Sequence, residues 1–158
     1  MVDDRDHLPG EQPAVRVGVD LTAVDEVADS VARLGERYLR RLFTDHEVAS
    51  SRGPEGLRAE SLAARFAAKE AAVKVLRPDG SRPEWRNIEV WRSPDGWCDL
   101  RLHGSAAALA ARRGVDHLSV SLSHEAGVAV AVVAATCRAG AGAGTAAARA
   151  ATVETRRA

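Results

Sequence analysis

Alternating hydrophobic and polar positions predict strands near both ends of the chain. Residues 15–21 alternate valine or leucine with smaller or polar side chains, which is typical of a strand with one buried face. Residues 118–123 alternate leucine or valine with serine and predict a second strand. Residues 128–135 are hydrophobic on both faces, which indicates a central strand.

Helical periodicity follows the first strand. Residues 24–34 carry valine and leucine at helical spacing, and Thr22 with Asp25 forms a weak capping box before them. A short helix is expected over residues 37–43, and another starts at residues 44–47. The other expectations are a break at 53–56, the longest helix at 57–76, a loop at 78–80, a strand hairpin at 88–91 and 97–102, and a helix at 105–113 that Gly114 ends.

The order of these elements predicts the fold class. A strand is followed by helices, two strands, one helix and two further strands. Consecutive strands pair most easily as hairpins, so the sheet should be largely antiparallel and the class α+β. We expect this sheet to pack against the long helix at 57–76.

Length and composition indicate one globular domain. The chain has 158 residues, of which 46% are hydrophobic and 28% charged. Residues 138–158 are low-complexity Ala/Gly/Arg sequence, and residues 1–13 are polar with proline and glycine. We expect both ends to be disordered and the domain to cover residues 14–137.

Several classes of protein are disfavoured. No hydrophobic run reaches the roughly 20 residues of a membrane span, and the N-terminus does not read as a secretory signal. Cys98 and Cys137 make neither a disulfide framework nor a metal-ligand spacing, which favours the cytoplasm. Residues 14–137 hold 17 basic and 17 acidic residues, without the basic excess of a general nucleic-acid binder.

The long helix carries the first candidate chemistry. At about 100° per residue it is hydrophobic on nearly every side, so it should be buried and its charges should need partners. Glu70 falls within the hydrophobic arc and Lys74 at its margin. At spacing i, i+4 they either pair with each other or belong to a functional site. The only lysines among the 22 Lys and Arg residues, Lys69 and Lys74, both lie in this helix.

Two strand ends carry further candidates. Asp20 ends the first strand on its polar face and is either a helix-capping residue or part of a site, while Gly18 leaves room for a close approach to the backbone. Three serines line one face of the strand that ends in His124. A serine–histidine nucleophile is one reading, although no G-x-S-x-G elbow accompanies it, and a structural histidine is another.

Five short segments match one family in order and spacing. They are residues 17–21 (VGVDL), 65–74 (RFAAKEAAVK), 85–90 (WRNIEV), 100–104 (LRLHG) and 121–124 (SLSH). The set resembles the small, single-domain holo-acyl-carrier-protein synthases, and the resemblance spans essentially the whole predicted domain. It implies the 4′-phosphopantetheinyl transferase fold.

The resemblance also implies an activity and its partners. Such enzymes transfer 4′-phosphopantetheine from coenzyme A to a serine of an apo acyl carrier protein and release adenosine 3′,5′-bisphosphate. They use magnesium and are typically homotrimers with active sites at subunit interfaces. The rival hypothesis is a non-catalytic module on the same scaffold that binds coenzyme A or oligomerises.

By the same resemblance, five residues have expected roles. Asp20 and Glu70 would hold Mg²⁺, an ion that suits one or two carboxylates plus substrate phosphates. Lys74 would bind the pyrophosphate, and Arg65 and His124 the adenosine 3′-phosphate. Glu70 and Lys74 are therefore the expected catalytic residues, with Glu70 or a water on the metal as proton acceptor.

Two segments depart from the family pattern, and one further residue is a candidate. The glycine loop that usually follows the helix is replaced by residues 76–80, where Arg77 offers a charge in place of backbone donors. The usual arginine of the first helix, which faces the acidic carrier, is replaced by Glu26. Glu125, beside His124, is a second candidate for the proton acceptor.

Overall fold

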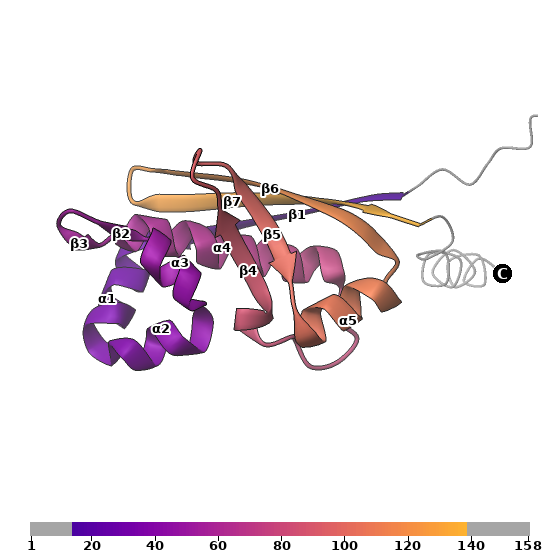
Figure 1. The fold of residues 1–158 in the computed structure, drawn as a ribbon, viewed down its shortest axis with the longest axis horizontal. Helices are drawn as coiled ribbons and strands as arrows, with labels where there is room; N and C mark the ends of the chain where they lie inside the picture. The colour runs from indigo at the N-terminus through magenta and orange to yellow at the C-terminus, as the bar shows by residue number, and fades with distance from the viewer. Residues whose placement is uncertain (1–13, 139–158) are drawn as a thin grey trace, which may run out of the picture.

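A three-stranded antiparallel sheet forms one layer of the protein. The computed structural model describes residues 14–138, and in it β7 (Val128–Cys137) lies between β1 (Ala14–Ala23) and β6 (Val115–Glu125). The three long strands run along one side of the molecule (Figure 1). The α+β prediction is confirmed, and so is the central position of the doubly hydrophobic strand.

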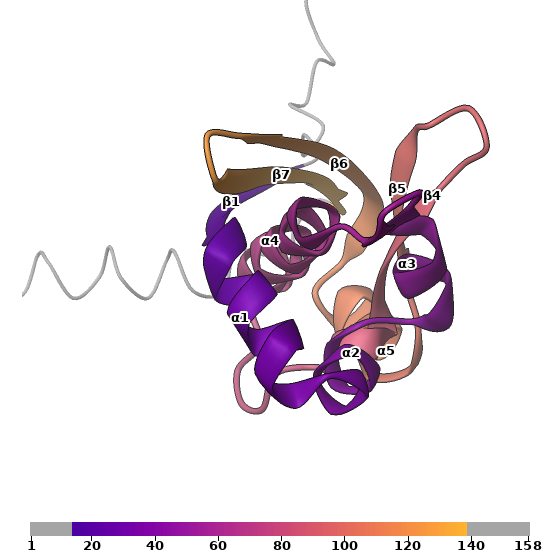
Figure 2. The same cartoon turned by 90° about the vertical axis from the view of Figure 1, so that its left-hand side faces the viewer.

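The long helix α4 (Ala59–Leu76) packs beneath this sheet. Figure 2 shows the sheet arched over α4, with α1 beside the helix and α2 and α5 farther from the sheet. Most α4 residues are buried, as predicted, because the sheet covers one side and the helices with β4 cover the other. A Cβ atom on Gly18 would lie 2.2 Å from the backbone oxygen of Ala71, so glycine is required where β1 crosses α4.

The hydrophobic face of β1 points away from α4. Val15, Val17, Val19 and Leu21 are 67%, 61%, 43% and 65% exposed, so the prediction that this face is buried is wrong for a single chain. The other face carries the Gly18 contact and therefore packs on the helix. We call the exposed side the outer sheet face; it also includes Val128 and Val132 of β7 and the serines of β6.

Three short helices cover one end of α4. They are α1 (Val24–Leu34), α2 (Glu36–Leu42) and α3 (Asp45–Ser50). A capping box formed by Thr44 and Glu47 starts α3 at the predicted place. The Thr22–Asp25 capping box is absent: Ala23 is the N-cap of α1, and the Val24 amide donates instead to the Gly127 backbone oxygen in the β6–β7 turn.

Two hairpins and a short helix complete the fold. The predicted break forms a small hairpin of β2 (Arg52–Gly53) and β3 (Gly56–Leu57), and the predicted hairpin forms β4 (Ile88–Arg92) and β5 (Cys98–Leu102). The 3₁₀ helix η1 (Trp85–Asn87) precedes β4, and α5 (Gly104–Arg112) follows β5. No helix among residues 14–138 is long and apolar enough to cross a membrane. Apart from Arg138, the ends predicted to be disordered lie outside the described residues.

Candidate active site

Asp20 and Lys74 meet where β1 crosses α4. Asp20 lies on the inner sheet face, two residues beyond Gly18, and the Lys74 Nζ is 2.8 Å from its Oδ1. The same Nζ donates to the Val19 backbone oxygen. The structure thus joins two residues that are 54 positions apart in the sequence. Asp20 accepts from a cation rather than capping α1.

Glu70 lies one turn before Lys74 on α4 but has a different partner. Its Oε1 is 3.4 Å from Arg82 Nη1, in the segment that follows α4. Among the described residues, Glu70 and Lys74 do not pair with each other, so the intrahelical ion pair is not formed. Glu70 and Lys74 thus each have a partner from another part of the chain, although Lys74 is exposed and the prediction that it is buried is wrong.

Arg65 is almost completely buried one and a half turns before Glu70. It donates to the Ser61 backbone oxygen at 3.0 Å, to Ser61 Oγ at 2.6 Å and to Ser50 Oγ at 2.9 Å. Its buried Nε has no hydrogen-bond partner among residues 14–138. Burial lowers the pKa of Arg65, and the nearby Glu47 carboxylate acts in the opposite direction.

Arg65 and His124 line one hollow between α4, the β4–β5 hairpin and the end of β6. This hollow has a volume of about 230 Å³. Its wall also includes Arg58 and Arg92, which sequence reasoning missed because neither lies within the quoted motifs. Three arginines and a histidine outweigh the one carboxylate in the wall, Glu60, and favour a strongly anionic ligand such as a phosphate group.

The serines near His124 do not face this hollow. Ser121 and Ser123 pair across the sheet with outward residues of β7, whereas His124 pairs with the buried Ala129. Successive side chains of a strand point to opposite faces, so these serines lie on the outer sheet face. The serine–histidine nucleophile is therefore not formed.

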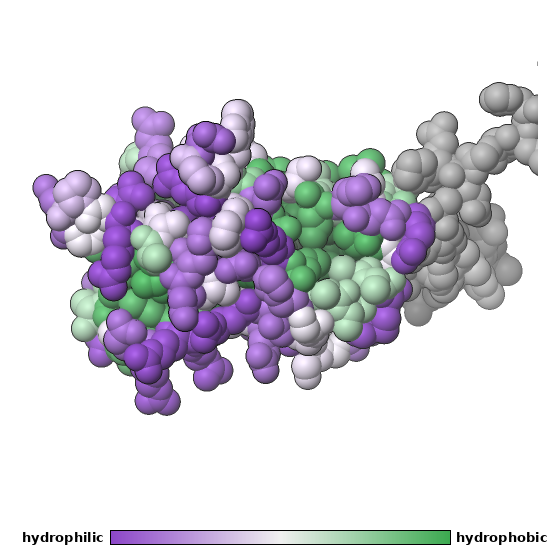
Figure 3. All heavy atoms as spheres, in the orientation of Figure 1, coloured by the Kyte–Doolittle hydropathy of each residue, from purple (hydrophilic) through white to green (hydrophobic). Residues whose placement is uncertain are grey.

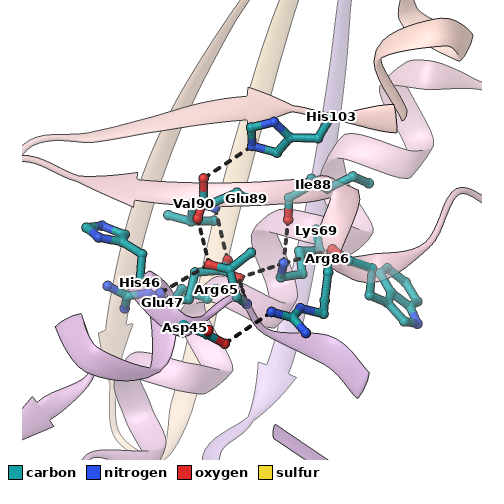
Figure 4. A network of polar contacts seen from close by, with 12 residues as sticks. Asp45, His46, Glu47, Arg65, Lys69, Arg86, Ile88, Glu89, Val90 and His103 are labelled. Carbon is teal, nitrogen blue, oxygen red and sulfur yellow. Dashed lines mark hydrogen bonds and ion pairs between the residues drawn. The ribbon is translucent and has the colours of Figure 1, made fainter. Parts of the chain in front are cut away.

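A buried ion pair fixes the other side of α4. Lys69 Nζ lies 2.9 Å from Glu47 Oε2, and both side chains are fully buried (Figure 4). The amine also donates to the Trp85 and Ile88 backbone oxygens. Glu47 Oε1 accepts from the Val90 amide at 2.9 Å. Burial lowers the pKa of Lys69, and the Glu47 carboxylate counteracts this shift.

The donor set at the β1–α4 crossing fits a magnesium ion. Residues 14–138 hold no group of three or more His, Cys, Asp or Glu side chains that could bind a metal on their own. Magnesium does not need one, because it typically takes one or two carboxylates and completes its shell with waters and substrate phosphates. Asp20 pairs with Lys74, and Glu70 lies one turn before Lys74 on α4; both carboxylates are partly exposed and suit that requirement.

Comparison with known proteins decides the family. Residues 16–133 match the 4′-phosphopantetheinyl transferase superfamily. The chain belongs to this superfamily. Its curated relatives include the holo-[acyl-carrier-protein] synthase of Herpetosiphon aurantiacus, 42% identical over 120 residues that cover 72% of this chain and 91% of the relative. The synthase of Frankia casuarinae is 47% identical over 118 residues, covering 73% and 92%.

Solved holo-acyl-carrier-protein synthases share the fold. The coenzyme A complex of the Chronobacterium ammoniagenes synthase superposes with a TM-score of 0.67 at 32% identity and covers 79% of this chain and 98% of its own. The Mycobacterium tuberculosis synthase superposes with a TM-score of 0.61 at 32% identity, covering 77% and 96%. The resemblance drawn from the five motifs is confirmed, and the phosphopantetheinyl transferase fold with it.

Proposed function

We propose that this chain is a holo-acyl-carrier-protein synthase, which transfers 4′-phosphopantetheine from coenzyme A to a serine of an apo acyl carrier protein. The observation that carries the proposal is the β1–α4 crossing. Glu70 and Lys74 lie one turn apart on α4, and Asp20 of β1 pairs with Lys74. The anion-binding hollow of Arg65 and His124 adjoins the same helix. Its solved relatives include a synthase in complex with coenzyme A.

The reaction replaces a phosphoanhydride bond of coenzyme A with a phosphate ester bond to serine. The serine oxygen forms a bond to the phosphorus that carries pantetheine, the bridging P–O bond of the diphosphate breaks, and adenosine 3′,5′-bisphosphate leaves. Asp20 and Glu70 would hold Mg²⁺, which when bound supplies positive charge to the diphosphate oxygens. The Lys74 ammonium, 52% exposed, would swing from Asp20 to the diphosphate and stabilise the leaving group.

The remaining roles concern the proton and the nucleotide. The free oxygen of Glu70 would accept the serine proton. Glu125 lies on the outer sheet face, paired with Val128, which makes Glu70 the better candidate within one protomer. The hollow of Arg65 and His124 would bind the 3′-phosphate.

Intact-mass spectrometry of a carrier protein tests the function. After incubation with coenzyme A and Mg²⁺, the apo carrier should gain the mass of one phosphopantetheine group, and omission of coenzyme A should abolish the gain. The non-catalytic alternative predicts that the chain binds coenzyme A while the carrier mass stays unchanged with every carrier tested.

We also propose a homotrimer that covers the outer sheet face. Exposed hydrophobic side chains that lie next to one another mark interaction surfaces, and β1 presents a continuous row of them. The trimer itself follows from the family resemblance. Because both cysteines of the described chain are free thiols, we further place the enzyme in the reducing cytoplasm.

Val17→Asp should break the trimer, because it places a charge within the exposed hydrophobic row of β1. Light scattering should give three protomer masses for the parent chain and one for the variant. Leu34→Asp is the matched control: Leu34 is a 48% exposed leucine on α1, away from the sheet, and its substitution should leave the trimer intact. A parent chain that is monomeric and fully active would refute the proposed assembly.

Glu26→Arg should raise kcat/KM for an acidic fatty-acid carrier, mainly through a lower KM. Glu26 is exposed in the first turn of α1, where related enzymes place an arginine toward the carrier, and like charges slow the encounter of two proteins. We therefore expect a gain of about fivefold at low salt that shrinks as ionic strength rises. Glu55→Arg, in the exposed β2–β3 turn, is the control. An unchanged ratio at low salt would place Glu26 outside the carrier interface.

A further inference from the structure

Each carboxylate that would hold magnesium already has a side-chain cation as its partner. Lys74 pairs with Asp20 at 2.8 Å, and Arg82 pairs with Glu70 at 3.4 Å. The four charges sum to zero. A divalent cation placed among them competes with Lys74 and Arg82 for the same oxygens and is repelled by both, unless an anion arrives with it.

The guanidinium of Arg82 lies against an aromatic ring as well as beside Glu70. The guanidinium carbon lies 4.9 Å from the centre of the Trp85 ring, a cation–π distance. The Trp85 ring packs on Phe66 of α4 with ring centres 5.4 Å apart, and its backbone oxygen accepts from Lys69. The arginine side chain is nevertheless 56% exposed. The charged end of Arg82 is therefore held beside the Trp85 ring and remains accessible to an anion.

The surroundings of Arg82 attract anions. The side chain lines an open hollow of about 460 Å³ together with Arg40, Arg41 and Arg86, and the four arginines outweigh the one carboxylate in its wall, Glu84. Figure 3 shows hydrophilic side chains gathered along this lower edge of the molecule, over α2. A concave surface rich in one sign of charge raises the local concentration of ligands of the opposite sign.

The segment after α4 lacks the family's glycine loop, so a side-chain cation has to replace the backbone donors to the diphosphate. Arg77, the residue that directly follows α4, forms no ion pair among the described residues, and its backbone amide is used to cap the helix through Val73. Asp79 pairs with Arg113 at 3.1 Å, which ties the loop toward α5. Arg82 is the arginine of this segment that reaches Glu70.

We propose that Arg82 binds the diphosphate of coenzyme A and that it moves there from Glu70 when Mg²⁺ takes the carboxylate. The proposal rests on the proposed function. Arg82 and Lys74 then act alike. Each pairs with one carboxylate in the free enzyme, and each binds the same diphosphate when coenzyme A is present. This exchange makes the binding of Mg²⁺ and of coenzyme A mutually dependent, because each ligand removes the charge that opposes the other.

Arg82→Gln separates the two halves of the exchange. The glutamine no longer competes for Glu70, so Mn²⁺ used as a paramagnetic probe should bind about three- to tenfold more tightly in the absence of coenzyme A. The dissociation constant of coenzyme A, measured calorimetrically with Mg²⁺ present, should rise about tenfold. Arg82→Lys should restore part of the coenzyme A affinity, since it restores the charge but not the planar fork.

Arg86→Gln is the matched control. Arg86 lines the same hollow, but its guanidinium pairs with Asp45 at 3.1 Å rather than with Glu70. Both dissociation constants of this variant should stay within about twofold of the parent. If the arginines of the hollow attract coenzyme A only through their summed charge, both variants should lose coenzyme A affinity equally. That result would overturn the assignment to Arg82.

The outcomes distinguish this proposal from the proposed function. If the parent chain loads the carrier while Arg82→Gln leaves the Mn²⁺ or the coenzyme A affinity unchanged, the exchange is wrong and the synthase activity stands. If the parent chain loads no carrier, the proposed function fails whatever Arg82 does. Circular dichroism and the unfolding midpoint of each variant confirm that the compared proteins are folded.

Discussion

Glu70→Gln should lower phosphopantetheine transfer at least about 100-fold, and Asp20→Asn should do the same. Each substitution keeps the size of the side chain but removes one anionic ligand of the proposed magnesium site. Metal stabilisation of charge on a transferred phosphoryl group contributes several kcal/mol, and about 1.4 kcal/mol corresponds to a factor of ten in rate. Glu70→Gln also removes the proposed acceptor of the serine proton, so its loss should be the larger one.

The fold should survive both substitutions. Glu70 and Arg82 are 26% and 56% exposed, and ion pairs of that exposure contribute about 0–1 kcal/mol to the free energy of unfolding. The measurements are the rate at which the carrier gains mass and the unfolding midpoint of each variant. Glu55→Gln, an exposed carboxylate in the β2–β3 turn, should retain full transfer. Near-normal turnover by a folded Glu70→Gln or Asp20→Asn enzyme would exclude these carboxylates from the mechanism.

The pattern of hydrophobic positions predicted most of the fold because local spacing decides it. The long helix, the central strand and the 88–102 hairpin follow from periodicity and turn residues alone. The capping box at Thr22 failed because the Gly127 backbone oxygen, more than a hundred residues away, satisfies the first amide of α1. Local sequence rules show which backbone groups need a hydrogen-bond partner, but they do not show which distant residue supplies it.

The same limit explains the outer sheet face. Alternation shows that one side of β1 is hydrophobic, and it does not distinguish burial within the chain from burial against another chain. The polar side turned inward because Gly18 permits the closest approach of α4. The glycine on the polar side of β1 was the one feature of the sequence that could have indicated which face packs on α4.

The candidate site divides in a similar way. Asp20, Glu70, Lys74, Arg65 and His124 were predicted because they lie in motifs, and the structure joins Asp20 to Lys74 and Arg65 to His124. The partners that complete these groups, among them Arg82 and Arg92, lie in segments without a motif. Lys69 was noted as one of two lysines in a hydrophobic helix and lies in the 65–74 motif, but it received no role; its partner Glu47 was noted only as part of a helix start at residues 44–47.

Lys69→Met should lower the free energy of unfolding by about 3–5 kcal/mol. Methionine fills a similar volume but leaves the Glu47 carboxylate buried without its counter-charge, and removal of one partner of a buried ion pair has a cost of this size. The substitution also removes the donor to the Trp85 and Ile88 backbone oxygens, so η1 and the start of β4 lose their anchor on α4. Urea unfolding at one fixed protomer concentration measures the change, since assembly affects apparent stability.

A second substitution shows whether the buried charge is the cause. Lys69→Met combined with Glu47→Gln removes the uncompensated carboxylate and keeps an amide oxygen near the Val90 amide, so it should recover part of the loss. Arg40→Gln is the control for an ordinary ion pair: Arg40 and Glu36 are 76% and 66% exposed, and the change should stay below about 0.5 kcal/mol. The pair does not hold α4 in place if the free energy of unfolding of Lys69→Met lies within about 1 kcal/mol of the parent value, or if the double variant is no more stable than the single one.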